Sequence, residues 1–147
     1  MGFRDEIAGG ATLAEAQGMT QELGRAIAGV ASAELHAGRV EVARRIVEGL
    51  AVTNPHEPAA WALLALIEKR RGRPLTARIC GETAHFLAPE DPQVRLVRAE
   101  VLLAYPAERS EARAELEALS TVAEGAVAAR ARALLAALGP QDGRLGA

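Results

Sequence analysis

The sequence predicts an all-α protein: an α-solenoid of about three helix pairs with a C-terminal capping helix. Half of its 147 residues are hydrophobic but only 3% are aromatic, and most of the apolar residues are Ala and Leu, which favour helices. Six pairs of similar residues also recur at a spacing of 34: Gly38 and Gly72, Arg39 and Arg73, Ala43 and Ala77, Pro55 and Pro89, Glu57 and Asp91, Pro58 and Pro92. A fixed period of this size is typical of stacked helical repeats.

The first two helices follow from apolar periodicity and from their caps. Thr20 can cap a helix that runs to about Ala37 and stops at Gly38. Its apolar positions recur at three- and four-residue steps, which predicts one apolar face made of Leu23, Ile27, Val30 and Ala31. A second helix is expected from Val40 to about Val52, with these residues facing inward: Val42, Ala43, Ile46, Val47 and Leu50.

Prolines set most of the later boundaries. Asn54-Pro55 ends the second helix, because Pro disfavours helical geometry in the residue before it. Pro58 then opens a helix at its first turn, where Pro is tolerated. Further helices are expected over about 58–71, 74–88, 92–104, 108–120 and 124–138. Apolar positions along them include Trp61, Leu64 and Ile67, then Ala77, Ile79 and Ala84, then Leu96, Val97 and Val101, then Ala112, Leu116 and Leu119, then Val127, Leu134 and Leu138.

The repeat array is expected to span 20–139, with units 24–57, 58–91 and 92–126 and the capping helix 124–138. Residues 1–19 form an N-terminal segment that is partly helical or disordered. Thr12 followed by Glu15 has the form of a capping box, whereas Gly9-Gly10 breaks an early helix. Residues 140–147 are expected to be a disordered tail.

The units resemble tetratricopeptide repeats. That family favours Trp, Leu and a small residue in the first helix, Gly at the turn, a small residue in the second helix and Pro near the end of each unit. The second unit matches with Trp61, Leu64, Ala65, Gly72, Ala77 and Pro89, and the first with Ile27, Val30, Ala31, Gly38, Ala43 and Pro55. The third unit departs from the pattern with Arg95, Arg98 and Ala99.

The resemblance implies a concave groove that holds an extended peptide or a helix. The family's groove-facing positions correspond here to Arg25, Ala28, Ser32, Leu35 and His36, to Ala59, Ala62, Leu66, Lys69 and Arg70, and to Gln93, Leu96, Glu100, Leu103 and Ala104. The family's clamp for a C-terminal carboxylate needs Lys and Asn at fixed groove positions. This chain has Ala28, Ser32, Leu63, Gln93 and Val97 there, so a receptor of that kind is not expected.

A narrower resemblance is to the class II (translocator) chaperones of bacterial type III secretion. These small cytosolic proteins have an N-terminal helical segment, three such repeats and a final helix, and they hold translocator subunits in the groove. The size, repeat number and acidic pI of the chain match that group. The implied function is a non-enzymatic chaperone or adaptor whose partner is a protein or peptide. The alternative is a structural scaffold that forms a homodimer through residues 1–23 or through the alanine-rich last helix.

Other chemistry is not expected. The sequence contains no phosphate-binding loop, zinc-ligand spacing or nucleophile motif, so we expect no enzyme, cofactor or metal. A net charge of −2 argues against nucleic acid as a partner. No apolar run approaches the length of a membrane span. Asp5 and Glu6 stand where a signal peptide would carry positive charge, and Cys80 is the only cysteine, so a cytoplasmic location is expected.

Several single features have a plain structural interpretation beside a functional one. The basic run Lys69-Arg70-Arg71 with Arg73 is either a solvated helix end or a contact for an acidic peptide. Trp61 is interpreted as a packing residue rather than a ligand anchor, and Cys80 as a small buried residue. The set Glu111, Arg113 and Glu115 is interpreted as an exposed helix face.

Overall fold

The structure is a computed structural model that describes Gly9, Thr12, Gly18 and residues 20–140. The expectations for the rest of 1–19 and for 141–147 therefore lie outside the described residues. The helices are α3 (Gln21–His36), α4 (Val40–Thr53), α5 (Pro58–Arg70), α6 (Pro74–Leu87), α7 (Pro92–Leu102), the 3₁₀ turn η1 (Pro106–Glu108), α8 (Arg109–Val122) and α9 (Gly125–Leu138). The described residues contain no strand, and the all-α class is confirmed.

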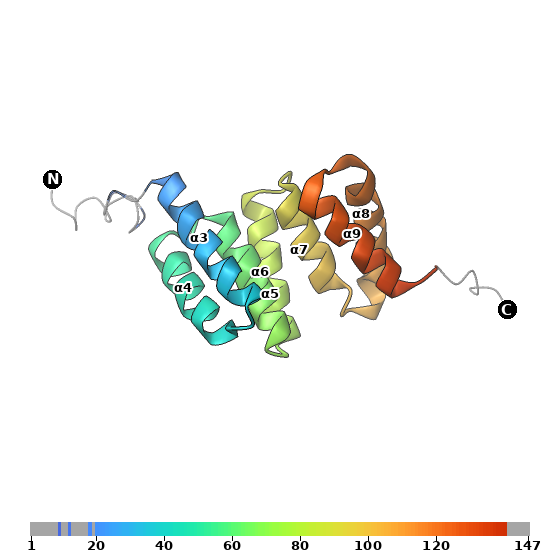
Figure 1. The fold of residues 1–147 in the computed structure, drawn as a ribbon, viewed down its shortest axis with the longest axis horizontal. Coiled ribbons are helices and arrows are strands. Elements are labelled where there is room, and N and C mark those ends of the chain that lie inside the picture. The colour runs from blue at the N-terminus through green and yellow to red at the C-terminus, as the bar shows by residue number, and fades with distance from the viewer. Residues whose placement is uncertain (1–8, 10–11, 13–17, 19, 141–147) are drawn as a thin grey trace.

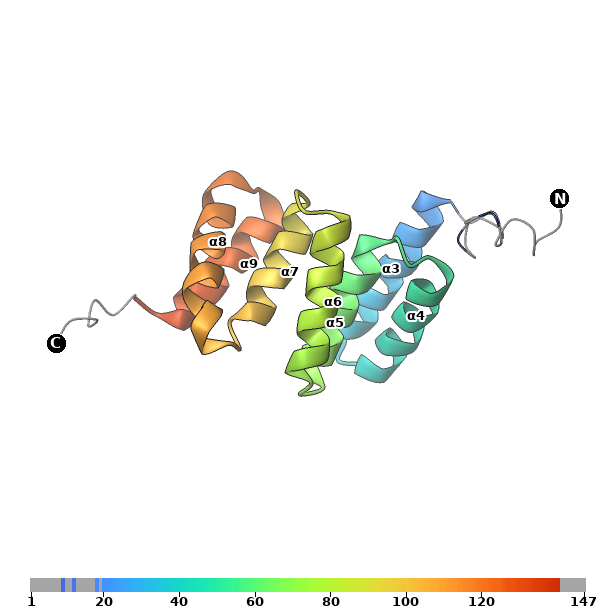
Figure 2. The same cartoon turned by 180° about the vertical axis from the view of Figure 1, so that it is seen from behind.

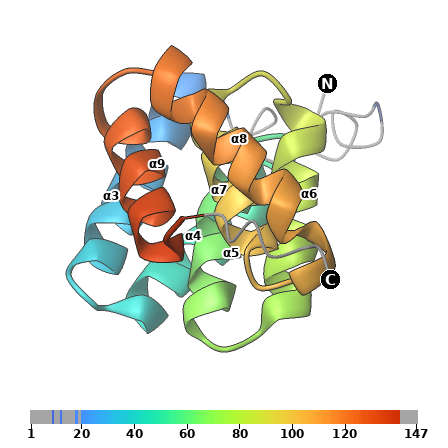
Figure 3. The same ribbon diagram turned by 90° about the vertical axis from the view of Figure 1, so that its right-hand side faces the viewer.

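The helix pairs follow one another in chain order along the long axis, with α3 and α4 at one end and α8 and α9 at the other (Figures 1 and 2). Figure 3 views this stack from the α8–α9 end. The α-solenoid predicted from the 34-residue period is therefore the observed architecture.

The repeating residues set the turns and caps of the helix pairs. Gly38 and Gly72 have φ of 81° and 73°, in the left-handed region that a side chain disfavours, and they let the chain reverse between α3 and α4 and between α5 and α6. Glu57 and Asp91 cap α5 and α7: the Glu57 carboxylate accepts from the Ala59 amide at 3.3 Å, and the Asp91 carboxylate from the Gln93 amide at 2.8 Å.

The core is divided into three apolar clusters along the stack. The first lies among α3, α4 and α5, the second among α5, α6 and α7, and the third among α7, α8 and α9. Trp61, Leu64 and Leu66 pack against both the first and the second cluster. No side chain recorded for the described part of the chain belongs to both the second and the third.

Trp61 acts as a packing residue at the joint between the first two clusters. Its indole Nε1 also donates a hydrogen bond to the Pro55 carbonyl at 2.7 Å. The contact fastens α5 to the turn that precedes it, because one side chain joins apolar packing to a backbone acceptor.

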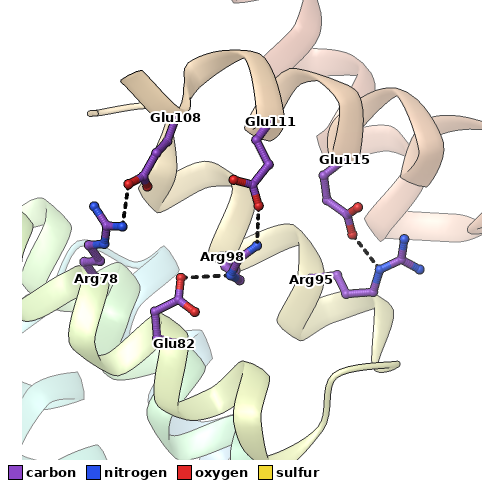
Figure 4. Close-up of polar contacts among 7 residues, drawn as sticks. All are labelled: Arg78, Glu82, Arg95, Arg98, Glu108, Glu111 and Glu115. Carbon is purple, nitrogen blue, oxygen red and sulfur yellow. Dashed lines mark hydrogen bonds and ion pairs between the residues drawn. The ribbon is translucent and has the colours of Figure 1, made fainter. Parts of the chain in front are cut away.

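Ion pairs add to the apolar packing at the second joint of the stack, where α7 lies between the second and the third cluster. Arg95 and Arg98 stand in the third unit where the family favours Trp and Leu. Arg98 pairs with Glu82 of α6 at 2.9 Å and with Glu111 of α8 at 3.2 Å, and Arg95 pairs with Glu115 at 2.5 Å (Figure 4).

Arg78 of α6 and Glu108 complete this set, and the Arg78 guanidinium also lies over the Tyr105 ring, 4.6 Å from its centroid (Figure 4). The interpretation of Glu111, Arg113 and Glu115 as an exposed helix face is only partly right: Glu111 is exposed, whereas Arg113 and Glu115 are half-buried. The two carboxylates bridge helices, and Arg113 donates to the Gly139 carbonyl at 2.7 Å. The sequence pattern places these charged side chains at the surface of α8, but it does not show that Glu111 and Glu115 pair with arginines of α7.

The expected inward face of the first helix pair is also partly wrong. Leu23, Val30 and Val42 are 49%, 55% and 44% exposed, and the buried face of α3 consists of Gly24, Ala28, Ala31 and Leu35. The buried face of α4 consists of Ala43, Val47, Leu50 and Ala51. Ile79 is likewise exposed, on an open face of α6 shared with Leu75 and Phe86.

Candidate binding groove

A groove of about 1120 Å³ runs across the faces of α3, α5 and α7 and reaches α9. These are the first helices of successive pairs, together with the final helix, so a single side of the stack contributes the lining. The walls combine small and aliphatic side chains, such as Ala28, Leu63, Leu66 and Leu96, with charged groups. A concave site with apolar walls and a few placed polar groups suits an extended chain or a helix.

The structure brings almost all of the predicted groove residues together. The residues that line it as expected are Arg25, Ala28, Ser32, Leu35, His36, Ala59, Ala62, Leu66, Lys69, Arg70, Gln93, Leu96 and Glu100. Leu103 and Ala104 do not line it. The helix expected over 92–104 ends at Leu102, and the Leu103 side chain packs against the third apolar cluster instead of facing the groove.

Sequence reasoning missed the contribution of α9, which adds Ala126 and Arg130 to the lining. A signal was available. Ala28, Ala62 and Leu96 follow one another at the 34-residue spacing, and one further step arrives at Arg130. The final helix therefore serves the groove as the first helix of a further pair would, in addition to closing the stack.

Glu100 is the polar centre of the groove. It is only 6% exposed, and its Oε1 accepts from Lys69 Nζ at 2.9 Å and from Arg130 Nη2 at 2.7 Å. Burial by itself raises the pKa of this carboxyl group, but the hydrogen bonds from Arg130 and Lys69 outweigh burial and lower the pKa. The ionised carboxylate thus ties α5, α7 and α9 together.

Most side chains of the basic run bind partners within the chain. Arg70 Nη1 donates to the Leu35 carbonyl at 2.7 Å, where α3 ends. Arg71 pairs with Glu68 at 2.7 Å and with Glu41 at 3.3 Å. Glu68 is itself buried. Only the Lys69 and Arg70 end of the run reaches the groove.

Cys80 and His36 both make contacts within the fold. Cys80 is buried, and burial, together with the charge of Glu68, raises the pKa of its thiol to about 11. His36 Nδ1 lies 2.7 Å from the Ser32 carbonyl of its own helix. Across the described residues, no group of three His, Cys, Asp or Glu side chains is arranged to hold a metal ion. None of the described helices is both long and apolar enough to cross a bilayer.

Comparison with known proteins gives a fold and no sequence family. No protein-family model matches the chain, and no curated protein matches it either. Among solved structures, the Yersinia enterocolitica type III secretion translocator chaperone SycD superposes with a TM-score of 0.66 at 18% identity, over 86% of this chain and 98% of that one.

Two further structures are similar. A type III secretion complex from Aeromonas hydrophila gives a TM-score of 0.67 at 20% identity, over 92% of this chain and 93% of that one. SycD in complex with a peptide of the translocator YopD gives 0.60 at 18% identity, over 82% of this chain and 95% of that one. The chain therefore shares the helical-repeat fold of these structures.

Proposed function

We propose that this chain is a non-enzymatic protein-binding module that holds an extended segment of a partner polypeptide in the groove. The observation that carries the proposal is the continuous groove across α3, α5, α7 and α9, which combines apolar walls with several charged side chains. A groove formed by four helices matches a long segment better than a small molecule, because each helix adds contacts along the length of the segment.

The finer proposal is a small cytoplasmic chaperone of the type III secretion kind. It is supported by the fold shared with SycD, which has been solved with a peptide of the translocator YopD. The partner of this chain would then be a secreted subunit kept bound before export. An apolar groove serves that purpose by covering hydrophobic side chains that would otherwise aggregate.

A steric block of the groove tests the proposal. Gly29 lies within α3 and lines the groove, and a Cβ added there meets no atom within 4 Å. Gly29→Trp should therefore place a large ring in the groove without disturbing the packing. Gly49→Trp is the matched control, since Gly49 lies within α4, has equally open space, and does not line the groove.

Each variant is expressed in the source cell, its partner is identified by crosslinking and mass spectrometry, and binding of the purified partner is measured by calorimetry. We expect Gly29→Trp to lose binding and Gly49→Trp to keep it, with both variants as helical as the wild type. Unchanged binding by Gly29→Trp would refute the groove as the binding site.

Self-association is a second candidate function, favoured by the exposed apolar side chains at the α3–α4 end of the stack. Leu23, Val30 and Val42 are the side chains concerned. Analytical ultracentrifugation of the full chain, of a deletion of 1–19 and of the Val30→Glu variant tests it. A dimer that is lost in either altered chain supports the scaffold; a monomer in all three rules it out.

A further inference from the structure

Charged side chains are unevenly distributed over the groove lining. Three cations stand together on its α5–α9 side, and we call Lys69, Arg70 and Arg130 the basic cluster. Glu100 is the one carboxylate in contact with them among the described residues. This local excess of positive charge contrasts with the net charge of −2 for the whole chain.

Contacts within the chain leave the basic cluster under-neutralised. Lys69 and Arg130 share a single oxygen, Oε1 of Glu100. Arg70 donates to a backbone carbonyl and has no carboxylate partner within the described part of the chain. Each guanidinium can donate several hydrogen bonds, so most of the donor capacity of the cluster is unused.

The other groove carboxylates do not compensate the cluster. Glu57 and Asp91 are held at the first turns of α5 and α7, where they accept from backbone amides. The cluster lies near the opposite end of α5, whose last residue is Arg70. The two kinds of charge therefore occupy different ends of the same groove-lining helix.

Favourable interaction with helix C-termini explains the position of only some cations of the basic cluster. Cations favour the negative C-terminal end of a helix, and this explains Arg70 beside the last turn of α3. Arg130 lies in the first half of α9, where the helix dipole gives a cation no advantage. Its side chain is 52% exposed and that of Lys69 is 40% exposed, so both can reach a second carboxylate.

We infer that the groove selects a partner segment in which an Asp or Glu side chain lies against the basic cluster while apolar neighbours contact Leu66 and Leu96. The inference rests on the proposed peptide-binding function. The acidic group belongs to an internal residue of the partner, because Lys69 and Arg70 lie on α5, and a chain that crosses all four helices meets them before it reaches α9.

The test selects random peptides displayed by fusion at their C-termini, so that no peptide has a free terminal carboxylate. The full-length protein is the bait, and its Arg70→Gln and Lys69→Gln variants are selected in parallel. Arg45→Gln is the matched control, since Arg45 is an exposed arginine of α4 that does not line the groove. Gly29→Trp reports whether the selected peptides occupy the groove.

We expect wild-type and Arg45→Gln selections to be enriched in Asp and Glu relative to the starting library, with the enrichment reduced in both cluster variants. A synthetic peptide from the wild-type selection should bind Arg70→Gln about fivefold more weakly, as expected for a partly exposed ion pair. Replacing its acidic residue by Gln should weaken binding to the wild type similarly. The wild-type affinity should also fall with added salt.

Two other outcomes are decisive. Peptides that compete for the groove but show no acidic enrichment would overturn the charge preference and leave the groove function standing. Selected peptides that bind Gly29→Trp unchanged would instead remove the groove as the site, and the proposed function would fail with the inference. If Arg70→Gln unfolds, the Lys69→Gln result decides, because Lys69 donates to Glu100, whereas the hydrogen bond to the Leu35 carbonyl of α3 comes from Arg70.

Discussion

The Arg98 ion pairs should make the second joint of the stack sensitive to salt. The variant Arg98→Met removes the charge and keeps a long apolar stem. The Arg98 side chain is 24% exposed, and its partners Glu82 and Glu111 are 40% and 59% exposed. Pairs of this exposure contribute about 0.2–1 kcal/mol each, so the variant should lose about 1 kcal/mol of unfolding free energy at low salt.

Urea unfolding is the assay, because guanidinium would itself screen the charges. With a slope of about 2 kcal/mol per molar urea for a domain of this size, the midpoint should fall by about 0.5 M. At about 1 M NaCl the screening length drops to about 3 Å, and the difference between variant and wild type should shrink. A difference that stays constant with salt would show that Arg98 contributes packing alone and would refute the ionic account.

We also expect the two halves of the stack to unfold at different urea concentrations when the ion pairs of the second joint are removed. Trp61 fluorescence reports the first two clusters, and far-ultraviolet circular dichroism reports all helices. In Arg98→Met the dichroism should change at lower urea than the fluorescence. Arg44→Met is the matched control: Arg44 is 29% exposed and pairs with Glu41 and Glu48 within its own helix. Its two signals should change together, and a separation of signals there too would contradict the assignment to the joint.

Three further predictions concern single side chains. Cys80, with its pKa near 11, should react with a thiol reagent at about pH 8 far more slowly than it does in urea; equal rates would contradict its burial. The pKa of Glu100 is lowered from 4.5, so its stabilisation is present above that pH and is lost as the pH falls through the folded-state pKa. Glu100→Gln should therefore show a smaller acid-induced loss in urea midpoint than the wild type, and an equal loss would refute the assignment. Trp61→Phe removes the hydrogen bond to Pro55 and should cost about 1 kcal/mol in thermal unfolding followed by circular dichroism; an unchanged melting temperature would show that the bond contributes nothing net.

The features that sequence reasoning captured are those fixed by local chemistry. Gly38 and Gly72 mark turns that require positive φ, and Pro58 and Pro92 begin helices because proline suits the first turn. The predicted groove lining also agrees with the observed groove except at its third-unit edge, since the 34-residue period carries the facing of each helix from unit to unit.

What was missed depends on neighbours that a local pattern does not specify. Val42 has the spacing of a core residue, yet it is exposed, because α4 packs through the face that carries Ala43, Val47 and Leu50. Arg95 and Arg98 indicated a degraded unit, whereas their partners on α6 and α8 give them a bridging role. Arg130 was not predicted as a groove residue, because the last helix was interpreted only as a cap. Its spacing of 34 from Leu96 nevertheless repeats the period of the other groove residues.

The three apolar clusters are built from successive helices, so they can form one after another while the chain is being synthesised. The first cluster needs only α3, α4 and α5, and the second is complete once α7 has been made. The third waits for α8 and α9, and so does the Glu100–Arg130 contact. A chain leaving the ribosome N-terminus first can therefore fold the α3, α5 and α7 walls of the groove while the α9 wall is still missing. The groove becomes complete only when the whole repeat array has been synthesised.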